Sequence, residues 1–323
     1  MRSVIVTGGT GFIGSNLSKE LRNRFGPDCR IHALGSEVDL SNRTETFEWF
    51  EKIHWAEECD HILHLAALYK AGDWPVRHPA TQFFVNMSIN VNVLEAWKRY
   101  FPHAKMTSVL SYCIYPSHSD PHPEEEAYGT EPEEYLFAYA LTKKAQLIGQ
   151  RAYLEEHGLS AASVVLPTVY GPGDSFAENS HVMGALVGKF VRAAHQGLET
   201  VEVWGSGRQQ REFLFVEDAA DGIIQAALGQ TSPLINLGHG HTNSIREIAE
   251  IISDCAGFEG EIVHNENRFV GVDTRLLDVS RAKDELHWTA ATSIRSGIQK
   301  TVDWYRSQLQ IQTASSTSRC DKS

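Results

Sequence analysis

Short apolar runs alternate with longer stretches of helical periodicity through the first half of this chain. Between two of the runs, residues 86–99 place apolar side chains at Ile89, Val93 and Trp97, a spacing that predicts a helix. Strands that alternate with helices pair in parallel, and the helices then cover both faces of the sheet. We therefore expect an α/β fold with a Rossmann-type doubly wound parallel sheet. The predicted strands are residues 3–7, 30–34, 60–67, 106–110 and 163–166.

The regular alternation ends near residue 170, which indicates a second, smaller part of the chain. We expect this C-terminal part to be an α/β domain that binds the substrate, and the segment Glu212–Asp218 to return to the large sheet. The small, polar residues at the C-terminal end favour a flexible tail. The predicted boundaries are residues 1–170 with about 212–235 for the first domain, 171–211 with 236–310 for the substrate domain, and 311–323 for the tail.

Three glycines follow the first strand at intervals of three residues: Gly8, Gly11 and Gly14. Glycine permits a tight turn from strand to helix, a close approach of the backbone to a pyrophosphate, and close packing of the helix on the strand. The helix N-terminus then offers unpaired N–H groups to the phosphates. This pattern, with Phe12 and Ile13 inside it, predicts a dinucleotide-binding site.

The type of dinucleotide depends on the end of the second strand, where an acidic residue would bind the 2′-hydroxyl of NAD. Gly35 and Ser36 stand there instead, which leaves room for a 2′-phosphate. We therefore favour NADP (NADPH) over NAD. The residues expected to contact the cofactor beyond the glycine turn are Ser36, Asp39, Leu40, Ala66 and Ala67.

Five side chains from three distant segments supply groups for chemistry on a ketone: Ser111, Cys113, Tyr139, Lys143 and His181. The fourth strand delivers Ser111 and Cys113 at its carboxyl end, where ligands bind in open parallel sheets. Tyr139 and Lys143 are four residues apart and share one face of a helix. Hydrogen bonds to the ketone oxygen would stabilise the enolate that forms when a neighbouring carbon loses a proton. Cys113 would serve as the base, and His181 would return a proton.

Composition narrows the class of protein. The 323 residues carry a formal net charge of −12, which disfavours binding to nucleic acid and to an anionic membrane surface. The five cysteines are scattered and include no Cys-x-x-Cys pair, so we expect reduced thiols in a cytoplasmic protein. No apolar run approaches the roughly 20 residues that span a bilayer.

Two features could suggest metal ligands, but each has a simpler interpretation. The acidic residues between Glu124 and Glu134 are typical of a solvated loop before a helix. His239 and His241 have no third ligand near them in the sequence. We therefore expect no metal site.

Four longer motifs occur in a fixed order along the chain. They are Ser111-x-Cys113-Ile114-Tyr115-Pro116, Asn179-Ser180-His181-Val182, Val203-Trp204-Gly205-Ser206-Gly207 with Arg211-Glu212-Phe213-Leu214, and Leu276-Leu277-Asp278-Val279. With the glycine turn and the Tyr-x-x-x-Lys pair, this set resembles the extended short-chain dehydrogenase/reductase superfamily and is most similar to the GDP-L-fucose synthases. Those enzymes are 3,5-epimerase-4-reductases of GDP-4-keto-6-deoxymannose. The resemblance extends from Val4 to about Trp304.

The resemblance implies a role for each matching position. Tyr139 would protonate the C4 oxygen, and Lys143 would hold the nicotinamide ribose and lower the pKa of the phenol. Ser111 would hydrogen-bond the ketone, while Cys113 and His181 would epimerise C3 and C5. The resemblance further implies cofactor contacts from Leu166, Thr168 and His181, and substrate contacts from Asn179, Lys189, Trp204, Arg211 and Arg275.

The chain departs from the family at a few positions. Thr168 stands where asparagine is usual, Tyr112 where a second serine is usual, and Val270 where an acidic residue is usual. The loop from Leu68 to Trp74 also differs from the small-residue loop of the family. These differences concern the identity of the sugar more than the reaction.

Other functions stay open at this point. A 4-epimerase of the UDP-hexose type would need Tyr139 and Lys143 but would give no role to Cys113 and His181. A 4-ketoreductase without epimerisation, including one that acts on a GDP-6-deoxyheptose, is a second alternative. A non-catalytic NAD(P)-sensing protein would be expected to lack the tyrosine or the lysine. The resemblance implies a nucleotide-diphosphate sugar, GDP-linked, as substrate, and a homodimer formed through the helices that start near Asn86 and Tyr139.

Overall fold

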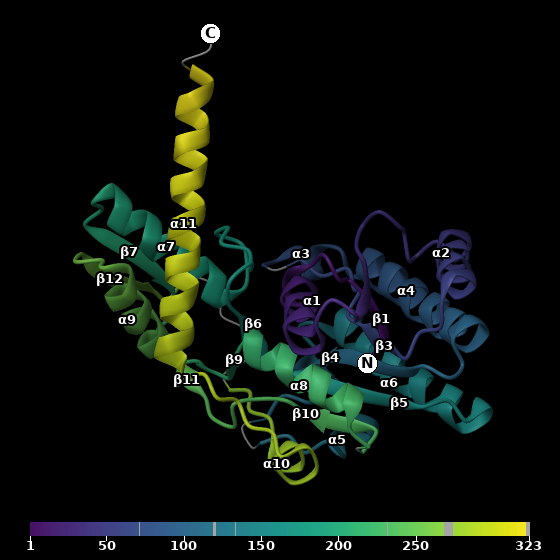
Figure 1. Ribbon diagram of the computed structural model, residues 1–323. Helices are drawn as coiled ribbons and strands as arrows, with labels where there is room; N and C mark the ends of the chain where they lie inside the picture. Colours follow the sequence, from purple (N-terminus) through teal and green to yellow (C-terminus); the bar gives the residue numbers. More distant parts are fainter. Residues whose placement is uncertain (71, 119–120, 133, 231, 268–273, 321–323) are drawn as a thin grey trace.

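A parallel sheet of six strands organises the computed structural model, which describes residues 1–70, 72–118, 121–132, 134–230, 232–267 and 274–320 (Figure 1). Val270 lies outside the described residues. The strands are β1 (Ser3–Thr7), β2 (Arg30–Leu34), β3 (His61–His64), β4 (Lys105–Ser111), β5 (Ala161–Leu166) and β10 (Leu234–Asn236). Their order is β10-β5-β4-β3-β1-β2, so the direction of winding reverses beside β1, where open α/β sheets bind their ligands. The predicted Rossmann-type α/β fold is confirmed.

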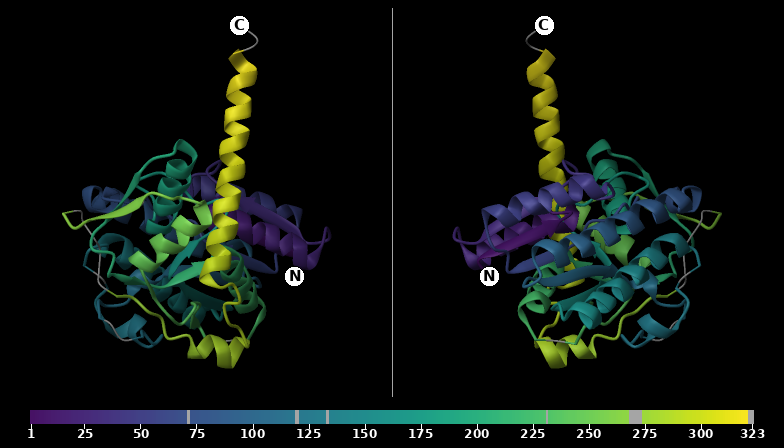
Figure 2. Two further views of the ribbon diagram at one scale, coloured as in Figure 1. Left: turned by 90° about the vertical axis from the view of Figure 1, so that its left-hand side faces the viewer. Right: turned by 90° about the vertical axis from the view of Figure 1, so that its right-hand side faces the viewer.

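Helices cover both faces of this sheet, as the apolar character of its inner strands requires (Figures 1 and 2). On one face α1 packs against α8 and shares a core with β1 and β5, and on the other face α4 packs between α2 and α6. The predicted helix at residues 86–99 is the C-terminal part of α4. These helices are α1 (Phe12–Phe25), α2 (Arg43–Ala56), α4 (Pro79–Tyr100), α6 (Phe137–His157) and α8 (Val216–Leu228).

A second apolar core lies in the C-terminal part of the chain, where α7, α9 and α11 pack together beside the parallel pair β7 and β12. Its elements are α7 (Val182–Gln196), β7 (Thr200–Trp204), β8 (Gln210–Arg211), β11 (Asn243–Ser244), α9 (Ile245–Ala256), β12 (Glu261–Asn265) and α11 (Ile294–Cys320). The short elements elsewhere are α3 (Trp74–Arg77), η1 (Tyr112–Ile114), α5 (Glu126–Gly129) and α10 (Ser280–Leu286).

The expectation that Glu212–Asp218 joins the large sheet is wrong. Its strand, β9 (Phe213–Phe215), pairs in parallel with β6 (Thr168–Tyr170) in a separate two-stranded sheet. Pro167 separates β5 from β6, so the chain leaves the large sheet before this pairing begins. The sixth strand of the large sheet is instead β10, which follows α8 and pairs with β5.

The C-terminal segment also differs from its expectation. Residues 311–320, assigned to a flexible tail, continue α11, which projects away from the rest of the molecule (Figure 1). Ile298 and Val302 anchor the start of this helix in the second core, and no glycine or proline follows before Cys320 to end it. The domain boundaries themselves stay a prediction.

Burial and pairing of single residues refine the remaining expectations. Glu124 is buried and accepts a hydrogen bond from the Asn236 N–H at 2.9 Å, so the acidic stretch is not a fully solvated loop. The cysteines with described side chains have free thiols and are all buried: Cys29, Cys59, Cys113 and Cys255. In the described part of the chain, no helix combines the length and the apolar character that crossing a bilayer demands.

Candidate active site

The turn between β1 and α1 has the geometry that its glycines were expected to provide. Gly8 adopts a φ of 70°, which favours glycine. A Cβ on Gly14 would lie 2.1 Å from the Gly8 carbonyl oxygen, so only glycine allows the helix to start this close to the strand. The first turn of α1 has no side-chain cap, which leaves its N–H groups available to an anion.

A cleft of about 380 Å³ opens at the carboxyl ends of the strands, directly over this turn. It brings together the glycine motif, the end of β3, and the Ser-Tyr-Lys set predicted for catalysis. The predicted residues that line it are Gly8, Gly11, Phe12, Ile13, Gly14, Ala66, Ala67, Ser111, Tyr139, Lys143, Leu166, Thr168 and His181. These residues would hold an NAD(P) cofactor against the catalytic groups.

Ser36, Asp39 and Leu40 are not among the residues that line the cleft. The end of β2 is instead crowded by an acidic side chain that the sequence interpretation did not consider. Glu37 accepts a hydrogen bond from the Gly35 N–H at 2.8 Å, and a Cβ on Gly35 would lie 2.1 Å from the Thr10 hydroxyl oxygen. A carboxylate therefore stands beside the glycine turn, where room for a 2′-phosphate was expected.

Lys143 is buried next to Tyr139, with its Nζ atom 5.9 Å from the centre of the tyrosine ring. Its ammonium donates hydrogen bonds to the Val109 carbonyl oxygen at 2.9 Å and to the Gln146 side-chain oxygen at 3.2 Å. An ammonium has three donors, so one remains for a ligand in the cleft. Burial lowers the pKa of Lys143 to about 8, and the nearby Cys113 opposes this shift.

The phenol of Tyr139 differs from its expected electrostatics. Burial raises the pKa of Tyr139 well above its ordinary value, and neighbouring Cys113 and Tyr69 act in the same direction. Lys143 was expected to lower this pKa. In the structure desolvation is the larger effect, so the phenol keeps its proton, as a proton donor must.

The two members of the predicted epimerisation pair lie in different surroundings. His181 lines the cleft, whereas Cys113 is fully buried behind it, packed against Tyr139. Burial raises the pKa of Cys113, although a hydrogen bond with Ser111 opposes the shift. The His181 residue is exposed as a whole, yet its ring lies among protein atoms, and this desolvation lowers its pKa. At neutral pH the thiol is therefore protonated and the imidazole neutral. The expected roles, with Cys113 as the base and His181 as the proton donor, require the opposite: a thiolate and a protonated imidazole.

Tyr69 is a site residue that sequence reasoning missed. Its ring stacks on His181, with centroids 5.1 Å apart and planes 9° apart, and lies 4.8 Å from the ring of Tyr139. It also packs against the buried cluster that contains Cys113. The loop that begins at Leu68 could have indicated this, because it differs from the small-residue loop expected from the resemblance. It also follows the carboxyl end of the central strand β3, where ligands bind.

Two departures from the family contact each other. The hydroxyl groups of Tyr112 and Thr168, at the positions where the resemblance led us to expect a serine and an asparagine, hydrogen-bond at 3.1 Å on the wall of the cleft. The guanidinium of Arg275 lies 4.6 Å from the centre of the Tyr112 ring. The two hydroxyl groups are therefore hydrogen-bonded to each other on this wall.

A second cleft, of about 190 Å³, lies in the C-terminal part and is lined by Lys189, Trp204 and Arg211. Nζ of Lys189 lies 5.0 Å above the ring of Trp204, a cation–π contact. Three of the five predicted substrate-binding residues therefore meet in one cavity with two cationic groups and an aromatic face.

The other two predicted substrate residues lie elsewhere. Asn179 is exposed beside Gly72, and Arg275 is buried near Tyr112. Ser180 and Val182 line the second cleft, while His181 between them lines the first. Consecutive residues of this segment thus contribute to both clefts.

Comparison with known proteins agrees with this geometry. The family model described as "NAD dependent epimerase/dehydratase family" matches residues 4–238. GDP-L-fucose synthase 1 of Arabidopsis thaliana is 32% identical over 308 residues, which cover 94% of this chain and 92% of that protein. The crystal structure of a GDP-L-fucose synthetase from Naegleria fowleri bound to NADP has a TM-score of 0.85 at 25% identity, covering 95% of each chain.

A further solved structure shares the fold. A GDP-6-OMe-4-keto-L-xylo-heptose reductase from C. jejuni has a TM-score of 0.84 at 24% identity, covering 95% of this chain and 98% of that one. At this identity the likeness shows the fold alone. The family match and the Arabidopsis relative nevertheless extend across the cofactor cleft and the catalytic segments. The chain therefore belongs to the NAD dependent epimerase/dehydratase family and is an oxidoreductase similar to the GDP-L-fucose synthases.

Proposed function

We propose that this protein is an NADPH-dependent epimerase-reductase that acts on a GDP-linked 4-keto-6-deoxy sugar. The observation that carries the proposal is that the consecutive residues 180–182 line both clefts, which we take as the junction between them. One cleft holds the glycine turn with Ser111, Tyr139 and Lys143, and the other offers Lys189 and Arg211 to a diphosphate and Trp204 to a base. A nucleotide sugar that spans the junction places its sugar beside the catalytic groups.

The reduction follows from the side chains that face the first cleft. The glycine turn and Lys143 would hold NADPH, which would supply the hydride for reduction at C4. Tyr139 donates its phenolic proton to the C4 oxygen, and Ser111 donates a hydrogen bond to the same oxygen as negative charge develops on it. The remaining N–H of Lys143 is available to the ribose. C3 and C5 epimerisation by Cys113 and His181 comes first in the proposed sequence.

One observation favours a second candidate, a 4-ketoreductase that does not epimerise. Tyr69 contacts the rings of both His181 and Tyr139 and packs on the cluster that buries Cys113. A sugar ring can reach the thiol only if Tyr69 moves. If it does not move, reduction at C4 still proceeds, because Ser111, Tyr139 and Lys143 remain open to the cleft.

Product analysis by NMR separates these two functions. We expect the protein, incubated in D₂O with GDP-4-keto-6-deoxymannose and NADPH, to give a C4-reduced product with deuterium at C3 and C5. Reduction without deuterium would support the second candidate. An absence of turnover with this substrate, together with turnover of a UDP-linked 4-keto sugar, would contradict both.

The cofactor preference gives a separate prediction. We expect the wild-type protein to favour NADPH, and Glu37→Gln to raise the NADPH-to-NADH ratio of kcat/KM by about tenfold. A carboxylate near a 2′-phosphate costs about 1–4 kcal/mol, and about 1.4 kcal/mol corresponds to a factor of ten. Glu48→Gln on the exposed face of α2 makes the same charge change away from the cleft and should leave the ratio unaltered. A wild-type preference for NADH that Glu37→Gln weakens would assign the carboxylate to the 2′-hydroxyl of NAD instead.

We also propose a homodimer, working in the cytoplasm, that forms through α4 and α6. These helices lie side by side (Figure 1). Both expose apolar residues at helical spacing. Such a stripe is typical of a surface that another chain covers. The exposed apolar side chains are Phe83, Phe84 and Val91 on α4, and Phe137, Leu141 and Ile148 on α6.

Charge placed in this stripe should dissociate the dimer. We expect the double variant Val91→Glu, Ile148→Glu to sediment as a monomer, because a carboxylate in an apolar interface loses its hydration. Trp55→Glu, which changes an exposed aromatic residue on α2, serves as the control and should remain dimeric. Sedimentation velocity at several concentrations measures the outcome, and a wild-type monomer at all of them would contradict the proposal.

A further inference from the structure

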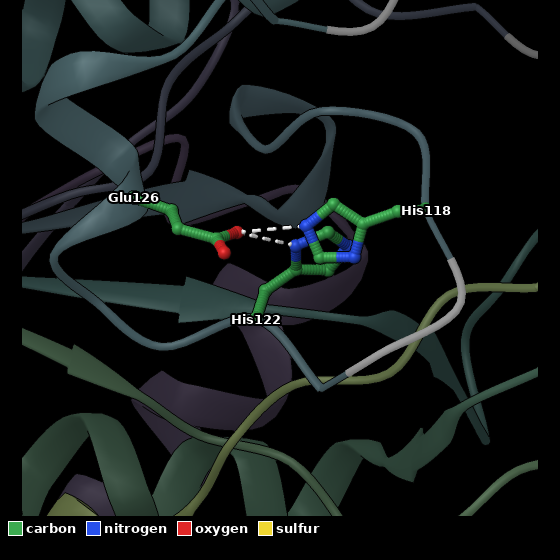
Figure 3. Close-up of side chains that lie close together, drawn as sticks. All are labelled: His118, His122 and Glu126. Atoms are coloured by element: carbon green, nitrogen blue, oxygen red, sulfur yellow. Dashed lines mark hydrogen bonds and ion pairs between the residues drawn. The ribbon is translucent and has the colours of Figure 1, made fainter.

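Two histidines and a glutamate form a cluster outside both clefts, on the chain between η1 and α6 (Figure 3). Nδ1 of His122 lies 2.8 Å from Oε2 of Glu126, and Nε2 of His118 lies 3.2 Å from the same oxygen. The ligand atoms of the three residues all lie within 4.8 Å of one another. We propose that this cluster binds one divalent transition-metal ion of the zinc type.

The donor set and its spacing fit such an ion. Two imidazole nitrogens and one carboxylate oxygen, completed by water, form a known type of tetrahedral zinc site. Metal–ligand distances of about 2.0–2.1 Å place neighbouring ligand atoms about 3.3 Å apart. The two separations from the Glu126 oxygen, 2.8 and 3.2 Å, need only a small expansion to admit the ion, and the ligand atoms of the two histidines lie within 4.8 Å of each other. His118 and Glu126 are partly exposed, so the ion and its water ligand have access from solvent.

His122 is held in place before any ion arrives. Its side chain is 2% exposed, and its ring stacks on Tyr115 with centroids 5.1 Å apart and planes 5° apart. Its backbone N–H donates to the Leu276 carbonyl oxygen, and its own carbonyl oxygen accepts from the Asp278 N–H, both at 3.0 Å.

The orientation of the rings supports convergence on a common ion. Each imidazole directs one nitrogen at the oxygen of Glu126. The far nitrogens, Nε2 of His122 and Nδ1 of His118, are buried and have no hydrogen-bond partner among the residues that the structure describes. Both rings are therefore oriented by the Glu126 oxygen, where the ion would bind, and not by hydrogen bonds from their far nitrogens. No other group of three possible ligands gathers in this way in the described ranges.

A bound ion would have a structural role. The cluster lies on the segment that connects the catalytic end of β4 to α6, the helix that carries Tyr139 and Lys143. Through the backbone bonds of His122 it is also joined to the strand-like segment that follows Arg275. The ion would fix this segment at the edge of the site without touching the substrate.

The test is metal binding by the untagged, full-length protein. After treatment with EDTA, equilibrium dialysis against Zn²⁺ with elemental analysis should give one ion per chain, and Co²⁺ should show the visible absorption of a four-coordinate site. We expect His118→Ala and Glu126→Gln to weaken binding at least tenfold. Zinc should raise the Tm of the wild-type protein and not that of the variants. Both changed side chains are partly exposed, and a Tm close to wild type in EDTA would confirm folding.

His241→Ala is the matched control, because it changes a second histidine pair with the same ring separation: the rings of His239 and His241 lie 4.1 Å apart in the C-terminal part, and those of His118 and His122 lie 4.1 Å apart in the cluster. This variant should bind zinc like the wild-type protein. Three results would overturn the proposal. They are no stoichiometric zinc, zinc binding that survives both ligand variants, and binding that is lost in His241→Ala. If the ligand variants have a lowered Tm in EDTA while the wild-type protein binds no zinc, the cluster is a hydrogen-bonded network only. This result would also overturn the proposal.

Discussion

Tyr139→Phe is expected to lower kcat for ketone reduction by about 10²–10⁴-fold, the usual contribution of a positioned general acid. The variant keeps the ring, which packs on Cys113 and Tyr69, and removes only the hydroxyl that would protonate the C4 oxygen. Ser111 still donates a hydrogen bond to that oxygen, so some activity should remain. Cofactor affinity, measured by fluorescence titration with NADPH, should change by less than about threefold, since the cleft keeps its shape.

Tyr128→Phe, which removes an exposed phenol on α5, is the control for this variant and should retain wild-type kcat. The pH profile of the wild-type protein gives a second readout. Burial lowers the pKa of Lys143 to about 8, so its ammonium is present below that pH and is lost above it. The raised pKa of Tyr139 keeps the phenol protonated over the same range. We therefore expect kcat to decline above about pH 8, and a Tyr139→Phe protein with wild-type kcat would contradict the assigned role.

Most residues that the sequence assigned to the site line the first cleft, because local rules were sufficient to bring them together there. Glycine is required at position 8 because of its positive φ. It is required at position 14 because a Cβ there would lie 2.1 Å from the Gly8 carbonyl oxygen. The position of Ser111 could be predicted because it ends a strand. The shared helix face of Tyr139 and Lys143 could be predicted from their i to i+4 spacing. Each of these inferences needs only neighbouring residues, and parallel strand order then brings them to one edge.

The failures occur where packing between distant segments decides. The pairing of β9 with β6 depends on where the chain leaves the large sheet, which no local pattern around Phe213 reveals. The direction of the Glu37 side chain, the burial of Cys113 and the stacking of Tyr69 on His181 likewise depend on contacts between loops. A loop residue such as Tyr69 carries no periodicity, so its place in the site could be found only from the fold.

Cys113→Ser and His181→Asn are expected to slow deuterium uptake at C3 and C5 by at least about 10²-fold in D₂O without NADPH. Both should still reduce a substrate that has already been epimerised, because Ser111, Tyr139 and Lys143 are unchanged. NMR of the recovered substrate measures the uptake, and absorbance of NADPH measures the reduction. Loss of reduction along with exchange would indicate damage to the cleft and not removal of a proton carrier.

The pH dependence of this exchange distinguishes which residue takes the first proton. Burial lowers the pKa of His181 and raises that of Cys113, so a neutral imidazole and a protonated thiol coexist from below neutral pH to alkaline pH. If His181 is the base, exchange is level across this range and falls only when the imidazole gains a proton at acid pH or the thiol loses its own at high pH. If the Cys113 thiolate is the base, exchange instead rises steadily with pH. We expect the level profile.

We expect Tyr69 to control the exchange, because its ring stacks on His181 and also packs against the cluster that contains the buried thiol. Tyr69→Phe keeps the stacked ring and should match the wild-type exchange rate, whereas Tyr69→Ala opens a path to Cys113. If the Tyr69 ring moves aside in the wild-type protein, Tyr69→Ala should exchange deuterium only slightly faster than the wild type. If the ring stays in place, the wild-type protein should reduce the ketone without exchange, and Tyr69→Ala should show exchange. If the wild-type protein, Tyr69→Phe and Tyr69→Ala all lack exchange, epimerisation is removed from the proposal. The 4-ketoreductase then remains as the proposed function.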